Sequence, residues 1–360
     1  MKKISKKPKN LLQYIFLILL MTVTTYLVAS TLDINILSDI LKVIDYKYIA
    51  VGFLLMISYI ILEGYILRVI INSIHGAKTK FLGYKVGILG LYYNLVTPMA
   101  SGSQPMQVYE LSKSNISASK AVAVVSNKTV IYQIMVTLYC IFLMAFNVDV
   151  LKSTLKPVLT FIAMGMSLNI VTLCFGFFIV YRPTQTKKFV HFIFNLLSKI
   201  KFLKFLDNKR PKVNSFIDEY NFSIKSFIKD KKALFKSTLL TIVQLTIYFS
   251  IAFCIYKALR LSGASYFYML SLQVFLYMAV SAMPTPGNIG ANEIAFFTIF
   301  GGIFSKAIIG YSVFLYGIFV YYFILIVCGL FTILSQGNVF RKIRLWLRFA
   351  KYKMNTATSK

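Results

Sequence analysis

The chain has 360 residues, of which 58% are hydrophobic and 14% are charged, and its mean hydropathy is +0.71. The apolar residues come in long blocks, which excludes an ordinary soluble domain and predicts an all-α polytopic membrane protein. The formal net charge of +29 comes from basic blocks that flank the apolar ones. Nucleic-acid binding is therefore not expected, and anionic phospholipids are the expected partners of these blocks.

Six stretches are long enough to cross a membrane, because a spanning helix needs roughly 20 mostly apolar residues. In chain order they are residues 11–30, 48–72, 121–146, 158–181, 237–257 and 307–335. The first follows a basic segment, as the core of a secretion signal does. Its apolar run is longer than a usual signal core, so we expect an uncleaved first helix.

Lys and Arg concentrate in three segments, which the positive-inside rule predicts to be cytoplasmic. They are the tail 1–10, the loop 182–236 and the tail 336–360. The loop has fourteen Lys and Arg against four acidic residues, and the C-terminal tail has seven and no acidic residue. We therefore expect one integral membrane domain over residues 1–360, multi-pass in the cell membrane, with both termini cytoplasmic.

Counting crossings from these segments shows that the apolar stretch 81–98 begins and ends on the cytoplasmic side. It is predicted to dip into the membrane and return through residues 99–118, or to form with them a hairpin of two short helices. Two more short apolar runs flank residues 281–293 and predict a second re-entrant pair, entered from outside. Full but short crossings satisfy the same count, which makes about eight transmembrane helices the alternative to six plus two re-entrant pairs.

The two irregular stretches resemble each other. Residues 94–105 (NLVTPMASGSQP) and 281–292 (SAMPTPGNIGAN) each carry Thr-Pro followed by Gly and by amide or hydroxyl side chains. Because they enter from opposite faces, they predict an inverted repeat with broken helices. Proline and glycine leave backbone groups unpaired, which hydrocarbon does not tolerate, so the breaks indicate a polar cavity. A plain interfacial turn is the alternative.

Ionisable residues inside apolar segments point to the same region, because charges at membrane depth are usually paired or line a pathway. Lys128 and Arg68 are candidates for contacting phosphate, with snorkelling to the interface as the alternative. Glu110 follows the first break and Glu293 the second; both are candidates for meeting a cationic head group or a coupling proton. Glu63 and Arg68 are five residues apart, which does not place them ideally on one helix face.

Residues 91–133 and 283–297 resemble the two signature regions of the lysylphosphatidylglycerol synthase transmembrane, or flippase-like, family. The residues that carry the resemblance are Asn94, Pro98, Ser101, Gly102, Gln104, Pro105 and Lys128 in the first region, and Pro284, Pro286, Gly287, Gly290 and Glu293 in the second. Ser103 is a departure, because a second glycine is common there. The predicted substrate pathway comprises Asn94, Thr97, Pro98, Gly102, Gln104, Glu110, Lys128, Pro284, Pro286, Gly287, Gly290 and Glu293.

The resemblance implies a flippase-like transporter that moves a phospholipid, such as aminoacylated phosphatidylglycerol, or another lipid-linked head group between leaflets of a bacterial plasma membrane. The alternative is phosphatidylglycerol lysyltransferase, which makes lysylphosphatidylglycerol from lysyl-tRNA in resistance to cationic antimicrobial peptides, or a membrane component of such a system. About 25 residues follow the last predicted span, too few for an acyltransferase domain. We therefore expect the membrane module alone, served by a separate lipid-modifying synthase.

Signatures of enzyme chemistry are missing from the sequence: it has no nucleotide-phosphate loop, metal-type spacing or nucleophile motif. No catalytic residue, metal or cofactor is predicted. The four cysteines lie in apolar runs without ligand spacing and are expected to be small buried hydrophobic residues.

The basic loop carries two helical patterns. Apolar residues recur at helical spacing over 213–228, and residues 187–206 are basic and apolar together. Both patterns suit helices that lie on the inner leaflet. Packing against the cytoplasmic ends of the bundle is the alternative.

Overall fold

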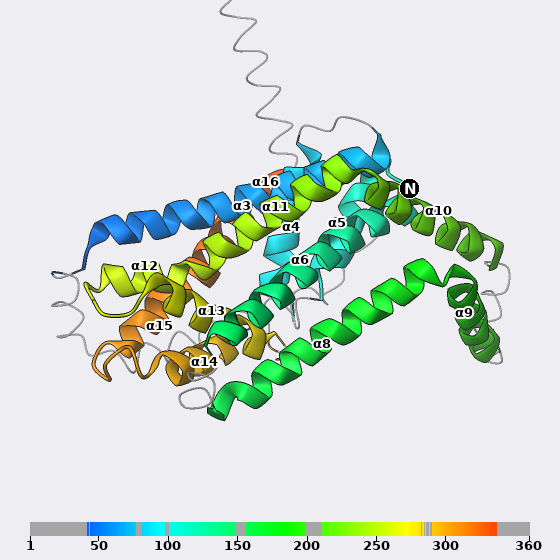
Figure 1. Ribbon diagram of the computed structural model, residues 1–360. Helices are drawn as coiled ribbons and strands as arrows, with labels where there is room; N and C mark the ends of the chain where they lie inside the picture. The colour runs from blue at the N-terminus through cyan, green and yellow to red at the C-terminus, as the bar shows by residue number, and fades with distance from the viewer. Residues whose placement is uncertain are drawn as a thin grey trace, which may run out of the picture.

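The computed structural model describes residues 42, 44–76, 81–97, 101–147, 156–198, 210–281, 283, 285, 288 and 290–336. Over these residues the regular structure is helical, with no strand (Figure 1). The predicted span 11–30, the tail 1–10 and residues 337–360 of the C-terminal tail lie outside the described residues.

Five helices of the described chain are long and apolar enough to cross a membrane. They are α3 (Tyr46–His75), α6 (Ala118–Phe146), α8 (Lys156–Tyr181), α11 (Lys231–Phe249) continued by α12 (Ile251–Ala258), and α15 (Ile309–Gly317) continued by the π-helix η2 (Ile318–Phe323) and α16 (Ile324–Gln336). Five of the six predicted spans are thereby confirmed, with bounds that differ by a few residues. The protein is a polytopic helical membrane protein.

Capping residues set the beginnings of these helices. Asp45, Ser117 and Asp230 precede α3, α6 and α11, and the side chain of each accepts a hydrogen bond from a backbone N–H of the first turn. Helix α3 ends at Gly76, whose φ of 73° is the left-handed conformation that favours glycine.

Two hairpins of short helices complete the bundle. They are α4 (Leu82–Val96) with α5 (Ser103–Lys113), and α13 (Tyr266–Val280) with α14 (Ala291–Phe300). At 1.5 Å per residue, helices of 10 to 15 residues are shorter than the bilayer core of about 30 Å. Two helix pairs, rather than additional full crossings, are therefore what the chain forms at these positions.

The two hairpins enter the bundle from opposite ends. Lys85 near the start of α4 pairs with Glu110 near the end of α5, and Gly83 packs against Arg68 of α3. The first hairpin therefore has its base at the end of the bundle where α3 finishes. The second begins at the other end, because Phe267 of α13 contacts Phe146, the last residue of α6, with ring centroids 6.2 Å apart. Figure 1 shows the two hairpins converging on the middle of the bundle.

Glycines bring the first hairpin close to α3. A Cβ on Gly64 would lie 2.6 Å from Cα of Tyr84, and one on Gly87 would lie 3.0 Å from Cα of Gly64. Only glycine fits at such a helix crossing, which is typical of helix pairs that pack inside membranes.

The loop between the third and fourth observed spans forms α9 (Pro183–Ser198) and α10 (Arg210–Lys229). Helix α10 buries Ile217, Ile224 and Phe227 against α6 and α3. It packs on one end of the bundle, which is the alternative considered for this segment. We call this the α10 end, and the opposite end the α12 end.

Helix α9 follows α8 at the α10 end and turns sharply away from the direction of α8 (Figure 1). One side is held to α10, where Nζ of Lys187 lies 2.6 Å from a carboxylate oxygen of Asp218. Phe189, Phe192 and Leu196 are 54%, 64% and 56% exposed. This amphipathic arrangement agrees with a helix at a membrane surface.

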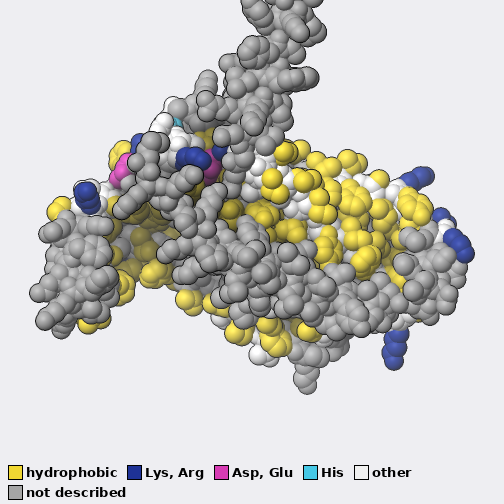
Figure 2. All heavy atoms as spheres, turned by 180° about the vertical axis from the view of Figure 1, so that it is seen from behind, with side chains coloured by type: hydrophobic (Ala, Val, Ile, Leu, Met, Phe, Trp, Pro, Cys, Tyr) yellow, Lys and Arg dark blue, Asp and Glu magenta, His cyan; other side chains and the backbone are white. Residues whose placement is uncertain are grey.

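The outside of the bundle is apolar. Figure 2 shows hydrophobic side chains over the middle of one face, with Lys and Arg nearer its two ends. Leu54, Leu138 and Val171, from three different spans, are each more than half exposed. Such a belt is stable only against lipid or another apolar surface.

Candidate functional site

Two adjoining chambers lie where the tips of the hairpins meet. The first has a volume of about 250 Å³ and the second about 430 Å³. Both are lined by Tyr59, Leu91, Asn94, Tyr132, Tyr277 and Ser281. The first continues between the second break and α11, and the second continues toward α5 and α6. The bundle thus has a partly polar interior, which is unusual for a span surrounded by lipid.

An ion pair lies in the wall of the second chamber. Nζ of Lys128 on α6 is 2.7 Å from Oε1 of Glu63 on α3, and Nε2 of Gln244 donates to Oε2 of Glu63 at 2.9 Å. The Glu63 side chain is 2% exposed and that of Lys128 is 18% exposed. A pair at this depth is neutral as a unit, and its accessible member is the cation, so an anion that enters the chamber meets Lys128 first.

Four tyrosines from four helices surround the first chamber. Ring centroids are 5.5 Å apart for Tyr59 and Tyr248, 6.0 Å for Tyr248 and Tyr277, and 6.4 Å for Tyr132 and Tyr277. Nζ of Lys128 lies 5.1 Å from the Tyr132 ring centroid, within the range of a cation–π contact. Tyrosine combines an apolar ring with a hydroxyl that donates or accepts, so this wall suits a ligand with polar and apolar parts.

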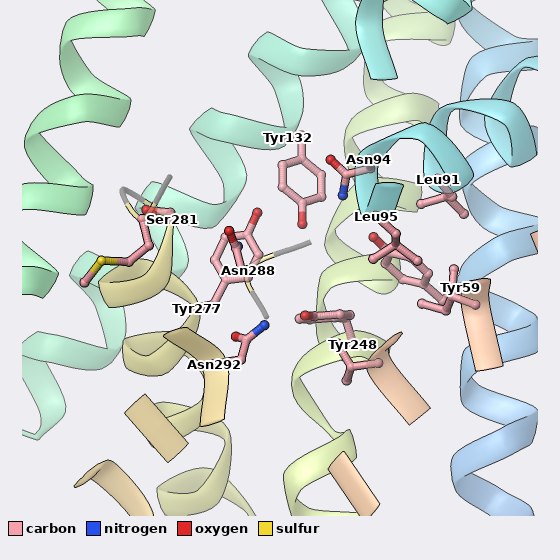
Figure 3. A pocket seen from close by; sticks show the side chains of 13 residues that line it. Tyr59, Leu91, Asn94, Leu95, Tyr132, Tyr248, Tyr277, Ser281, Asn288 and Asn292 are labelled. Atoms are coloured by element: carbon pink, nitrogen blue, oxygen red, sulfur yellow. The ribbon is translucent and has the colours of Figure 1, made fainter. Parts of the chain in front are cut away.

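Amide side chains from both breaks face the first chamber. Figure 3 shows the amides of Asn94, from α4, and Asn292, from the start of α14, pointing into the space between the hairpin tips. Asn288 lines the same space. Each amide offers two donors and an acceptor, so together they replace hydrogen bonds that a polar group loses when it leaves water.

The first break is held by Thr97. Its Oγ1 donates to the carbonyl of Tyr93 at 2.6 Å and accepts from N–H of Gly102 at 2.8 Å. A Cβ on Gly102 would lie 2.5 Å from Cγ2 of Thr97, so a larger residue there would displace the Thr97 side chain. Gln104 donates to Oγ1 of Thr129 at 3.3 Å and lines the second chamber.

The second break is held by Glu293. Its Oε2 accepts from N–H of Gly290 at 2.6 Å, which caps α14. Gly290 has a φ of 80° and Asn288 one of 57°, a backbone conformation that glycine and asparagine adopt more readily than other residues.

The predicted site residues therefore fall into four groups. Asn94, Gln104 and Lys128 line the chambers, while Thr97, Gly102, Gly290 and Glu293 shape the breaks. Within the described chain, Glu110 and Arg68 lie outside both chamber walls, Glu110 being 3% exposed and paired with Lys85. Pro98, Pro284, Pro286 and Gly287 lie outside the described residues.

Several lining residues were absent from the predicted pathway. Glu63 was considered only beside Arg68, and its observed partner Lys128 is 65 positions further along the chain. Asn288 and Asn292 lie within the second irregular stretch, which was the available sequence signal. Nothing in the sequence distinguishes the four chamber tyrosines from the other 20 of the 24.

No metal-type cluster of three or more His, Cys, Asp or Glu occurs among the residues whose positions are described.

Comparison with protein families finds a match to the family described as the lysylphosphatidylglycerol synthase TM region, over residues 10–328. Comparisons with curated proteins and with solved structures find no match. The matched range covers most of the chain, including both hairpins and the first four described spans, and it ends within α16 of the fifth.

Proposed function

The chain belongs to the family of lysylphosphatidylglycerol synthase transmembrane regions, and we propose that it moves an anionic phospholipid, or its aminoacylated form, between the leaflets of the cell membrane. The observation that carries this proposal is the position of the Lys128–Glu63 pair. It lies in a polar cavity formed where two hairpins from opposite ends of the bundle meet. Transporters with broken helices bind substrate in the same kind of place.

The lipid phosphate competes with Glu63 for Lys128 in this mechanism. The tyrosine hydroxyls and the Asn94 and Asn292 amides supply hydrogen bonds to the remaining head-group atoms. Leaving one such buried group unsatisfied costs about 1–3 kcal/mol. A lined cavity therefore lowers the barrier that a head group meets in bare hydrocarbon. The acyl chains remain in apolar surroundings throughout.

The orientation follows from charge. The loop that forms α9 and α10 is strongly basic, so in this proposal the α10 end is cytoplasmic. The first hairpin then opens from the cytoplasm and the second from outside, as alternating access requires.

The family's description favours a second candidate, in which the chain is a membrane component of lysylphosphatidylglycerol synthesis. The two candidates differ in what deletion changes. Loss of a transporter alters the distribution of a lipid between leaflets at constant amount, whereas loss of a synthase component lowers the total amount of lysylphosphatidylglycerol.

The direct test uses purified protein in phosphatidylglycerol vesicles that contain a trace of lipid with a fluorescent head group. A membrane-impermeant reductant bleaches the outer leaflet. With active protein we expect bleaching to proceed beyond the outer leaflet, and with the double variant Lys128→Met/Glu63→Gln we expect it to stop there. Lys113→Gln is the control, because Lys113 is an exposed lysine at the end of α5.

Two results contradict the proposal. One is a wild-type rate equal to that of protein-free vesicles. The other is a double variant that folds and moves the lipid as fast as the wild type.

A further inference from the structure

An apolar groove adjoins the second chamber. It has a volume of about 460 Å³ and lies between α6 and α8, with α10 at one end. Its walls are largely aliphatic and aromatic, with Val130 and Ile134 from α6, Phe175 and Ile179 from α8, and Ile224 and Phe227 from α10. Gln104, Thr129 and Gln133 line both the groove and the second chamber. The polar and apolar spaces therefore adjoin and share part of their walls.

We infer that this groove holds an acyl chain of the same lipid whose head group enters the second chamber. The inference rests on the proposed function and adds the path by which the lipid reaches the site. A polar chamber with an accessible cation, beside an apolar groove, matches the two ends of an anionic phospholipid.

The groove exists because α8 diverges from α6. Near the α12 end, α8 packs closely on α13, where a Cβ on Gly165 would lie 2.0 Å from the carbonyl oxygen of Met278. Further along α8, a Cβ on Gly176 would come only within ordinary contact distance of α6, 3.9 Å from Cγ2 of Val130. Figure 1 shows the two helices separating toward the α10 end.

The groove opens toward the surrounding lipid. Phe175 and Tyr181 line it and are 58% and 64% exposed. Both lie on α8, whose apolar surface is mostly exposed within the described structure. A lipid in the leaflet at the α10 end therefore has lateral access, without first leaving the bilayer.

Apolar burial alone does not fill such a groove, because lipid tails offer the same environment as an aliphatic wall. The groove acts through geometry instead. It lets the head group reach Lys128 while its chain stays in an apolar channel, and α10 limits how far the chain extends toward that end.

The test is photolabelling in phosphatidylglycerol vesicles that contain a trace of phosphatidylglycerol with a diazirine in one acyl chain. Adducts mapped by mass spectrometry are expected on α6 at residues 130–134. Ile131 in that range is 7% exposed and lines the groove. The variant Gly176→Phe narrows the groove, and we expect it to reduce these adducts and the translocation rate at least fivefold. Cys174→Phe is the matched control, because Cys174 is exposed, lies two residues away on α8 and is outside the groove lining.

A second probe identifies the occupant. Benzoylphenylalanine in place of Phe177, which lines the groove, is expected to give a lipid adduct that Gly176→Phe diminishes. An adduct with residues 1–41 or with a second copy of the chain overturns the inference. So do wild-type levels of α6 labelling in the Gly176→Phe variant.

The labelling map and the bleaching assay fail independently. If α6 is labelled but no translocation is seen, the proposed function is wrong and the acyl-chain site stands. If translocation is normal but α6 is not labelled, the acyl-chain site is wrong and the transport function stands.

Discussion

Lys128 and Glu63 neutralise each other's charge inside the bundle, and Gln244 donates a hydrogen bond to the carboxylate of Glu63. Removing one partner leaves a buried charge without a counterion, which typically costs about 3–5 kcal/mol; because Lys128 is only partly enclosed, about 2–4 kcal/mol is expected here. Removing both charges together avoids this penalty. The free energy of unfolding is therefore expected to fall more when one charge of the pair is removed than when both are removed together.

We predict that Lys128→Met and Glu63→Gln each lower the free energy of unfolding by about 2–4 kcal/mol, and that the double variant loses less than the sum. Denaturant unfolding in detergent micelles measures the three values as a double-mutant cycle. Additive losses contradict the pairing. The Lys113→Gln variant, at an exposed position, is expected to stay within about 0.5 kcal/mol of the wild type.

Two carboxylates, one on α10 and one directly after it, accept hydrogen bonds from serine hydroxyls of neighbouring helices. These bonds connect α10 to the spans. Hydrogen bonds from Ser119 and Ser117, the Ser117 bond being 2.8 Å long, lower the pKa of Glu219 below its ordinary value. Ser73 donates to Asp230 at 2.7 Å and, with the Ala233 backbone N–H, lowers the pKa of that carboxyl as well. Both carboxylates stabilise the folded state in their ionised form.

The sign of the pH dependence follows from these lowered pKa values. The contribution of Glu219 is complete above the ordinary Glu value of about 4.3 and is lost as pH falls through the lower folded value. We predict that the distance distribution between spin labels at positions 113 and 225 is constant from neutral pH to about 5 and broadens below about 4. Glu219→Gln should remove most of this change, and an unchanged acid response in that variant contradicts the assignment.

The positions of the helices along the chain could largely be predicted from the sequence. Which residues of neighbouring helices face each other could not. Long apolar blocks fix where spans occur, and the Thr-Pro-Gly stretches fix where α4 and α13 stop. Which residue of α6 faces Glu63 depends on how two helices pack, and a single sequence does not contain that information. The π-helical segment Ile318–Phe323 likewise has no marker in its apolar run, although Val320 within it lines the first chamber.

The helices of the whole molecule differ in how closely they pack on their neighbours. Helix α3 packs extensively on α4 and on α11, and α4 packs extensively on α5, while α8 packs mainly on α13 and less on α6. Movement that opens and closes the groove is therefore expected between α8 and α6.

A reversible tether tests this division. In a Cys174→Ser background, Val130→Cys/Gly176→Cys places two thiols across the groove, because a Cβ on Gly176 lies 3.9 Å from Cγ2 of Val130. Oxidation should stop translocation, and reduction should restore it. The control pair Ser73→Cys/Asp230→Cys joins α3 to α11, whose facing side chains are already hydrogen-bonded, and its oxidation should leave the rate unchanged. Equal inhibition by both tethers contradicts the division.

The glycine contacts between α3 and α4 have a mechanical consequence. Gly64, Gly83 and Gly87 bring the backbones of α3 and α4 close together, so sliding of α4 along α3 would bring backbone atoms into collision. The hairpin that carries Asn94 and the span that carries Glu63 then stay fixed relative to each other. If the head group is displaced relative to them, the elements that move are α8 and the α13–α14 hairpin.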